Sequence, residues 1–291
     1  MSRPTGVLDE ADAWNRLLGV RTERDAEAAG LVPGDDGGWR WRWTASPEAD
    51  RLALRYAPLC LAGPRHAFAQ LGQSVDGFIA TRTGDARYVT GEEDRRHLHR
   101  LRALADAVVV GAGTAAADDP RLTVRACAGA DPVRVVLDRS GRVPGDRGVF
   151  TDGAAPTLWV VDAGRVGEPE LRQGVEVLRV PGTDFAPGRL LDALARRGLG
   201  RVLVEGGGVT VSRFLAAGAL HRLYVTVAPL ILGEGVPGLR FPGPDTMGGA
   251  LRAPVRRFAL GDDSLFEFDL GPVRPGPCEV PRQQDTGARQ A

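Results

Sequence analysis

The sequence of 291 residues contains no lysine, so arginine carries every positively charged side chain. Chemistry that requires a lysine amine, such as Schiff-base catalysis, is therefore excluded. A bias towards arginine codons explains this usage more simply than the chemical preferences of arginine do. Basic and acidic residues number 37 each, which gives a formal net charge of zero. No overall field attracts nucleic acid or an acidic membrane surface, so we expect neither as a partner.

Cysteine is also scarce, and Cys60, Cys127 and Cys278 are too scattered to form a CxxC pair. His97 and His99 lie two residues apart in a predicted helix and face different sides of it, so they cannot form a metal pair. No metal is therefore predicted. No apolar run approaches the roughly 20 residues that span a bilayer, and the N-terminus is too acidic and polar for a secretory signal. We expect a cytoplasmic protein without a membrane partner.

The chain divides by composition into three parts. Residues 1–62 combine helical apolar spacing over 8–21 with alternating tryptophan and arginine over 39–43. A period of two predicts a strand that forms one arm of a hairpin. Base stacking is the alternative, but the acidic neighbours favour a structural role. Residues 273–291 are rich in proline, glycine, glutamine and arginine, and we predict a disordered tail.

The middle part, residues 63–272, alternates between predicted strands and helices, which indicates an α/β fold. We predict strands over 66–77, 106–113, 133–141, 157–162, 175–182, 201–208, 222–233 and 264–270. Helices are predicted over 91–105, 187–200 and 209–220, and a loop over 111–125. Helical crossovers imply a mostly parallel central sheet flanked by helices. We expect the last two strands to add to this sheet antiparallel, at one edge.

Three predicted strands end in glycine-bearing turns, at the edge of the sheet where ligands bind in such folds. The turns are 111-GAG-113, 139-RSG-141 and 206-GGG-208. Glycines let a phosphate approach the backbone, and the free N–H groups of a following helix point at the anion. The first turn lacks the completion of the Rossmann fingerprint. Together the turns indicate a nucleotide or another phosphorylated ligand.

Four charged residues near these turns have both structural and functional interpretations. Glu205 ends a buried strand, where carboxylates seldom occur without a partner, so a ligand contact is favoured over the capping of nearby N–H groups. Asp118 is a ligand contact or a turn former ahead of Pro120. Arg102 and Arg125 have the geometry to grip a phosphate, but taken alone a surface position explains them better.

Longer motifs resemble a known family. The segments 72-GQSVDGFIAT-81, 98-LHRLRALADAVVVGAGTAAADDPRLTVR-125 and 203-LVEGGGVTVSRFLAAGAL-220 are similar to the reductase domain of bacterial riboflavin biosynthesis, the RibD C-terminal domain. The resemblance covers residues 65 to about 271. It implies a dihydrofolate-reductase-like fold and an NADPH-dependent reductase. The implied substrate is 5-amino-6-(5-phosphoribosylamino)uracil, a phosphorylated pyrimidine whose sugar receives hydride at C1 and becomes a ribityl chain.

The resemblance also implies roles for residues at matching positions. Catalytic roles are implied for Glu205 and Asp118. Cofactor contacts are implied at Gly72, Gly111, Gly113, Thr114, Asp118, Arg139, Ser140, Gly206, Gly207, Gly208, Val209 and Thr210, with Arg139 and Ser140 meeting the 2′-phosphate. Substrate contacts are implied at Asp76, Arg102, Leu122, Arg125 and Glu205, with the arginines on the phosphate. Catalysis is then largely positioning, and the proton for the substrate nitrogen comes from water or Glu205.

On the substrate side the sequence departs from the family pattern. Phe78 stands where lysine or arginine is usual, and Ala86 and Tyr88 replace a serine and a tryptophan. One alternative is therefore a reductase of a related pterin, dihydrofolate or specialised-metabolite substrate, and another is a nucleotide-binding module without turnover. Residues 1–64 lack the HxE and PCxxC motifs of the family's zinc deaminase half, so we expect a stand-alone reductase. The resemblance also implies a homodimer.

Overall fold

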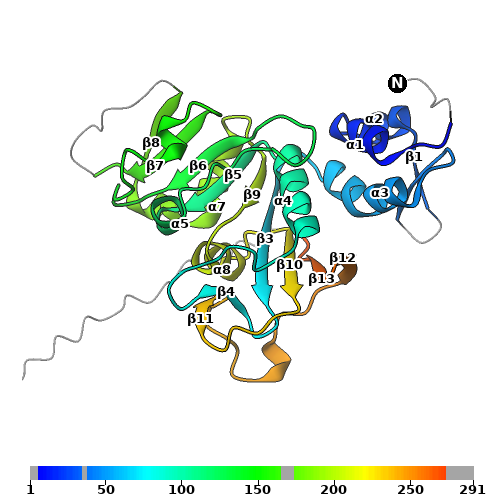
Figure 1. The fold of residues 1–291 in the computed structure, drawn as a ribbon. Helices are drawn as coiled ribbons and strands as arrows, with labels where there is room; N and C mark the ends of the chain where they lie inside the picture. The colour runs from blue at the N-terminus through cyan, green and yellow to red at the C-terminus, as the bar shows by residue number, and fades with distance from the viewer. Residues whose placement is uncertain (1–5, 35–37, 165–173, 273–291) are drawn as a thin grey trace, which may run out of the picture.

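The computed structural model describes residues 6–34, 38–164 and 174–272 (Figure 1). Its helices are α1 (Glu10–Leu18), α2 (Glu23–Ala29), α3 (Pro47–Cys60), α4 (Glu92–Leu104), α5 (Ala112–Ala117), α6 (Gly148–Thr151), α7 (Pro187–Ala195) and α8 (Gly208–Ala216). Its strands are β1 (Leu31–Pro33), β2 (Trp39–Trp41), β3 (His66–Ser74), β4 (Phe78–Thr81), β5 (Ala107–Gly111), β6 (Val133–Leu137), β7 (Thr157–Asp162), β8 (Val175–Val180), β9 (Arg201–Val204), β10 (Arg222–Ala228), β11 (Gly235–Pro237), β12 (Val255–Leu260) and β13 (Asp263–Asp269). The tail predicted over 273–291 lies outside the described residues.

A nine-stranded sheet forms the centre, in the order β12-β13-β10-β3-β9-β5-β6-β7-β8. Strands β3, β9, β5, β6, β7 and β8 pair in parallel, as predicted, and β10 also pairs with β3 in parallel. The expectation that β10 is antiparallel was wrong: it follows the crossover helix α8 and so returns parallel to β3. The antiparallel edge consists of β13 and the unpredicted β12, which are joined by a tight turn at Gly261 (φ 62°).

The buried strands supply side chains to a hydrophobic core on each face of the sheet. In β5, Val108 and Val110 belong to one core and Ala107 and Val109 to the other. This alternation follows from the period of two in a strand, and both faces need apolar residues because helices cover both. The sequence of β5 is therefore apolar at every position from Ala107 to Val110, without polar residues in alternation.

The segment 111–125, which we predicted to be a loop, begins with the short helix α5. Four of the six α5 residues are alanine, the strongest helix former, and the glycine-based prediction underestimated this preference. The irregular part starts at Asp118 and continues to β6. The predicted helix of α4 is confirmed, with Glu92, Glu93 and Asp94 in its first turn and Arg102 in its last, where each charge complements the helix dipole.

Residues 6–61, here called the N-terminal module, contain α1, α2, α3 and the antiparallel pair β1–β2 (Figure 1). The predicted hairpin strand and the helix near residue 8 are confirmed, whereas α2 and α3 were not predicted. Trp41 is buried and donates its indole N–H to the carbonyl of Ala49 at 2.8 Å. This contact confirms the structural interpretation of that tryptophan. The module shares one hydrophobic core with α4.

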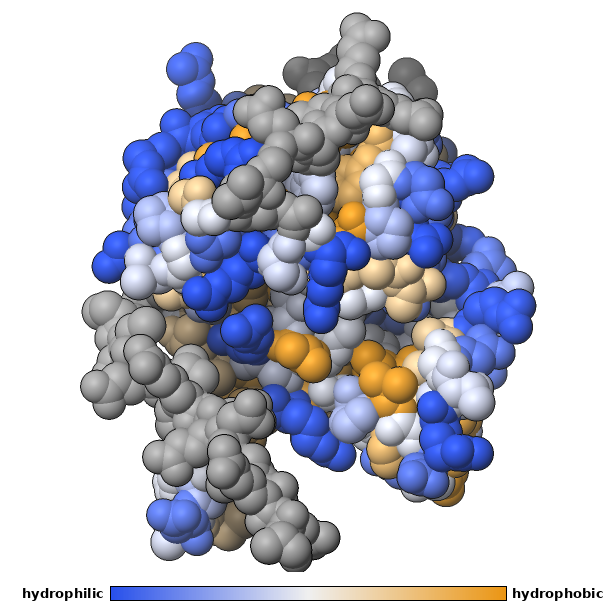
Figure 2. Space-filling model, turned by 90° about the vertical axis from the view of Figure 1, so that its left-hand side faces the viewer, coloured by the Kyte–Doolittle hydropathy of each residue, from blue (hydrophilic) through white to orange (hydrophobic). Residues whose placement is uncertain are grey.

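The face of the molecule on the side of β7 and β8 is mainly hydrophilic (Figure 2). Hydrophobic residues on that face form small separate groups between hydrophilic ones. Within the ranges described above, no helix is long and apolar enough to cross a membrane.

Candidate active site

The strand order brings most of the predicted site residues to one edge of the sheet. β3, β9, β5 and β6 are consecutive neighbours, and their carboxyl ends carry Gly72, Glu205, Gly111 and Arg139 respectively. The expectation that the glycine-bearing turns meet at one edge is therefore confirmed. This edge is where ligands bind in open α/β sheets.

The turn after β9 fits closely against α5. The backbone N–H of Gly207 donates to Thr114 Oγ1 at 2.9 Å. Gly206 has φ +95°, and a Cβ at that position would lie 2.8 Å from the same oxygen. A Cβ at Gly111 would lie 2.4 Å from Thr210 Oγ1 in α8. The glycines are therefore required by close backbone approach, and the N-terminus of α8 is held over the end of β5.

The other predicted cofactor residues differ in how closely protein atoms surround them. A Cβ at Gly208 would lie 1.9 Å from the carbonyl oxygen of Gly238, so this glycine serves packing. A Cβ at Gly72 would lie 2.7 Å from Thr90 Cγ2. Gly113 and Val209 are exposed, and Val209 begins the outer surface of α8. Among these predicted cofactor residues, Gly208 and Gly72 are therefore required by packing, whereas Gly113 and Val209 are open to a ligand.

Glu205 and Arg102 form a buried ion pair with two hydrogen bonds. Arg102 Nε donates to Oε1 at 2.8 Å and Nη2 donates to Oε2 at 2.7 Å, while Nη1 donates to the carbonyl of Thr123 at 3.0 Å. The side chains of Arg102 and Glu205 are 8% and 6% exposed respectively. Burial acts to lower the pKa of Arg102, but the Glu205 carboxylate outweighs it and the pKa is raised. Arg102 thus contacts Glu205 and Thr123 directly, and its contact with the substrate phosphate stays a prediction.

Arg125 is exposed and lies beside two other arginines. Its Nη1 donates to Thr123 Oγ1 at 2.7 Å, and its backbone N–H donates to His99 Nδ1 at 3.0 Å. Partial burial and the charges of Arg102 and Arg121 lower the pKa of Arg125. A site of concentrated positive charge is suited to an anion such as a phosphate.

The same irregular segment contains Leu122, Asp118 and Asp119. Leu122 has φ 57° and is 2% exposed, so its side chain belongs to the hydrophobic core. Asp119 connects this segment to α6, because its Oδ1 accepts the N–H of Gly148 at 2.7 Å. Asp118 is exposed at the site edge, yet neighbouring atoms reduce its hydration and raise the pKa of its carboxyl.

Arg139 and Ser140 border a cavity of about 520 Å³ that Asp162 and Gly164 also line. Asp162 ends β7, and its Oδ2 accepts a hydrogen bond from Arg139 Nε at 3.3 Å. We did not predict Asp162. The available signal was a carboxylate at the end of a buried strand, the same signal that identified Glu205.

Asp76 holds a turn together. Its carboxylate accepts the hydroxyl of Ser74 at 2.5 Å and the backbone N–H groups of Leu232 and Gly233. The bond from Ser74 contributes most to lowering the pKa of this carboxyl. Asp76 therefore connects the end of β3 to the segment after β10, and its oxygens already have donors.

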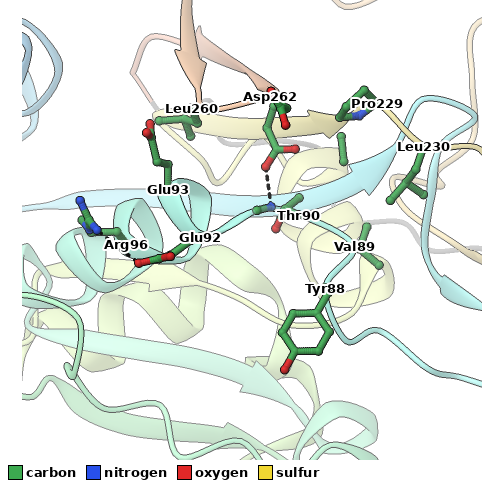
Figure 3. A pocket seen from close by; sticks show the side chains of 14 residues that line it. Tyr88, Val89, Thr90, Glu92, Glu93, Arg96, Pro229, Leu230, Leu260 and Asp262 are labelled. Atoms are coloured by element: carbon green, nitrogen blue, oxygen red, sulfur yellow. Dashed lines mark hydrogen bonds and ion pairs between the residues drawn. The ribbon is translucent and has the colours of Figure 1, made fainter.

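A second cavity of about 520 Å³ lies beyond β3, at the end of β10 (Figure 3). Its lining includes Tyr88, whose residue surface is 79% exposed, and the acidic residues Glu92, Glu93, Asp262 and Asp263 against the single cation Arg96. Acidic walls repel a phosphorylated ligand. The edge that carries Glu205 and Arg125 is therefore the better candidate site. In the described parts of the chain, no group of three or more potential ligands could hold a metal ion.

The fold and the glycine turns at its strand ends define a dihydrofolate-reductase-like α/β protein. The chain belongs to the RibD C-terminal domain family, because the model of that family matches residues 65–248. This match confirms the family and the fold that the motifs predicted.

Curated relatives and solved structures agree with the family. The chain is 38% identical over 206 residues to the 2,5-diamino-6-ribosylamino-4(3H)-pyrimidinone 5′-phosphate reductase of Methanothermobacter thermautotrophicus, covering 68% of this chain and 94% of that protein. It is 37% identical to riboflavin biosynthesis protein RibD of Aquifex aeolicus, covering 56% of this chain and 46% of that one. The deaminase/reductase structure from Thermotoga maritima has a TM-score of 0.61 at 26% identity, covering 76% of this chain and 60% of that chain. The chain thus spans nearly all of the archaeal reductase but about half of RibD.

Proposed function

We propose that this chain is an NADPH-dependent pyrimidine reductase of riboflavin biosynthesis. Its proposed substrate is 5-amino-6-(5-phosphoribosylamino)uracil or the corresponding diaminopyrimidinone named for the archaeal relative. The observation that carries the proposal is the buried Glu205–Arg102 pair between the glycine turn and Arg125. This arrangement offers one acceptor for a pyrimidine, one cation for a phosphate and a backbone turn for a nucleotide.

The residues at the sheet edge fit a nicotinamide dinucleotide. Gly111 and Gly206 allow the strand ends to pack closely against Thr210 and Thr114, and Thr114 also accepts the N–H of Gly207. The backbone turn that results is the proposed contact for the cofactor phosphates. Arg139 and Ser140, beside their cavity, would bind the 2′-phosphate. Bound NADPH supplies hydride for C1 of the ring-opened sugar. The protein contributes by positioning the two ligands against each other, which accounts for a large part of the rate in such reactions.

Glu205 acts in this proposal as a hydrogen-bond acceptor for N–H groups of the pyrimidine. Two hydrogen bonds from Arg102 hold its carboxylate in place. The proton for the substrate nitrogen comes from water or Glu205 in this proposal. Asp118 is proposed to contact the cofactor at the same edge.

Arg125 binds the substrate phosphate in this proposal. It is exposed, and partial burial together with the charges of Arg102 and Arg121 lowers its pKa. The phosphate would neutralise this repulsion. Arg102 contributes through its charge and through Glu205.

The alternative is a reductase of a pterin, dihydrofolate or another metabolite on the same fold. Phe78 and Ala86 on the substrate side motivate it. We further propose a cytoplasmic homodimer. Light scattering at micromolar concentration tests the dimer, and a monomer contradicts it.

The test of the function is NADPH oxidation in the presence of the amino-uracil, the diaminopyrimidinone and dihydrofolate in parallel. Turnover of one of the pyrimidine phosphates supports the proposal and shows which order of deamination and reduction the enzyme serves. Turnover of dihydrofolate alone supports the alternative. NADPH binding without oxidation by any of the three contradicts both.

A further inference from the structure

The N-terminal module lies outside the region that the family model matches, which begins at residue 65. It nevertheless contacts the segment 121–131, here called the Arg125 loop. Trp14 of α1 is 3% exposed and donates its indole N–H to the carbonyl of Ala128 at 2.8 Å. Ala128 is three residues from Arg125, so the module holds the loop that carries the proposed phosphate contact.

Packing at Gly129 adds a second contact between the module and this loop. Gly129 has φ +142°, and a Cβ there would lie 2.5 Å from Ala103 Cβ of α4 and 3.5 Å from Leu18 Cδ2 of α1. The loop backbone is therefore fitted between one helix of the module and one helix of the reductase domain. Val124 and Cys127 pack against the core that the module shares with α4.

The opposite side of the Arg125 loop is held by α4. His99 Nδ1 accepts the backbone N–H of Arg125 at 3.0 Å, and Arg102 Nη1 donates to the carbonyl of Thr123 at 3.0 Å. Between β6 and α5 this segment forms no helix or strand of its own, so these side-chain bonds determine where it lies.

The module also fixes α4 itself. Arg100 of α4 pairs with Glu10 of α1 at 2.5 Å, and its guanidinium lies 5.4 Å from the centre of the Trp14 ring. Tyr56 of α3 shares a 2.7 Å hydrogen bond with His97 Nδ1 on the buried side of α4. Trp14 and Tyr56 are in edge contact, with ring centres 5.5 Å apart. The contacting rings of Trp14 and Tyr56 therefore connect the module both to the Arg125 loop and to α4.

We propose that the N-terminal module is a brace for the substrate-phosphate side of the site, and that Trp14 is the positioning residue through which it acts. The role of Arg125 in this proposal rests on the proposed function. A guanidinium held in place before binding loses less conformational freedom when it grips a phosphate. Releasing the loop should therefore raise the KM for the phosphorylated substrate, while the turn at Gly206 and Gly207, which Thr114 holds, keeps its affinity for NADPH.

The chain offers a matched pair of variants, Trp14→Phe and Trp41→Phe. Each tryptophan lies in the module, is almost fully buried and donates its indole N–H to a carbonyl at 2.8 Å. The acceptor for Trp14 belongs to the Arg125 loop, whereas the acceptor for Trp41 is Ala49 of the module itself. Both substitutions remove one such bond, so a general loss of stability affects both.

The expected result is a KM for the pyrimidine phosphate that rises about fivefold in Trp14→Phe only, the factor that corresponds to one hydrogen bond of about 1 kcal/mol. The dissociation constant of NADPH should stay unchanged in both variants. Amide hydrogen exchange of residues 121–131 should accelerate in Trp14→Phe and not in Trp41→Phe. Equal exchange and equal KM in the two variants would overturn the brace. Amide hydrogen exchange needs no substrate, so it tests the brace even if the wild-type chain reduces none of the pyrimidines. That lack of turnover would reject the proposed function and not the brace.

Discussion

Arg102 and Glu205, 103 residues apart in the chain, meet at the edge of the sheet as a buried pair with two hydrogen bonds. α4 presents the arginine and β9 delivers the carboxylate. Burying two charges is costly, and their mutual contact compensates for it only while both are present. The pair therefore connects the stability of the domain to the chemistry of the site.

We expect Arg102→Met to lower the free energy of unfolding by about 3–5 kcal/mol, because it leaves the Glu205 charge buried without its partner. The double variant Arg102→Met with Glu205→Leu should recover much of this loss, since no buried charge remains. Both variants should lack reductase activity. Urea unfolding of the three proteins provides the measurement. If the single and double variants are equally unstable, the ion pair does not account for the effect.

The pH dependence of stability should reflect buried neutral histidines. Burial, with the nearby charges of Arg102 and Arg125, lowers the pKa of His99 from 6.5 to about 4. Burial, with His221 and Arg222 nearby, lowers the pKa of His66 to about 3. The unfolded chain thus binds protons at higher pH than the folded one, so stability is complete above about pH 6.5 and falls as the pH drops from there towards 4.

Thermal unfolding between pH 7 and pH 4 tests the predicted direction of the pH dependence of stability. The melting temperature should fall with pH in the wild-type protein and fall less steeply in His99→Gln, which removes one of the titrating groups. A melting temperature that rises as the pH falls through this window contradicts the assignment.

Gly206→Ala tests whether the turn after β9 depends on close approach. Its φ of +95° and the 2.8 Å distance to Thr114 Oγ1 leave no room for a methyl group. We expect a loss of about 1–3 kcal/mol in stability from the backbone conformation, together with weaker NADPH binding.

The matched control is Gly188→Ala in α7, where a Cβ would meet no atom within 4 Å. This change should stabilise the protein by about 0.5–1 kcal/mol, because alanine is the better helix former. Isothermal titration with NADPH separates the two variants. Unchanged affinity in Gly206→Ala would remove the turn from the cofactor site.

The choice between NADPH and NADH should depend on Arg139. Its Nε bonds to Asp162, which leaves the outer part of the guanidinium for a 2′-phosphate in the adjoining cavity. We expect Arg139→Met to raise the KM for NADPH about tenfold, a loss of about 1.4 kcal/mol, and to leave the KM for NADH nearly unchanged. A parallel rise for both cofactors would indicate a role for Arg139 other than phosphate recognition.

Much of the fold follows from local patterns in the sequence. The valine run of β5 and the acidic first turn of α4 identify those elements without any tertiary information. α5 was missed because its alanines lie between glycines and aspartates. The direction of β10 was mispredicted because this strand was grouped with the antiparallel edge strand β13, although the helix predicted over 209–220 implies a parallel return.

The site was predicted in part, for a related reason. The position of Glu205 at the end of a buried strand predicts that its carboxylate has a partner. That partner, Arg102, lies in a helix and is 103 residues away in the sequence. Sequence spacing contains no sign of that pairing. The contact of Arg102 with the substrate phosphate, which the family resemblance implies, stays a prediction. The same holds for the substrate contact of Leu122, whose side chain lies in the core.

The most direct test of the central claim is the transfer of label from NADPH that carries deuterium at the reactive nicotinamide carbon. The account predicts that one deuterium per turnover appears at C1 of the ribityl chain when the pyrimidine phosphate is the substrate. A product without deuterium at that carbon, or deuterium in the pyrimidine ring, would contradict hydride transfer to the sugar at this site.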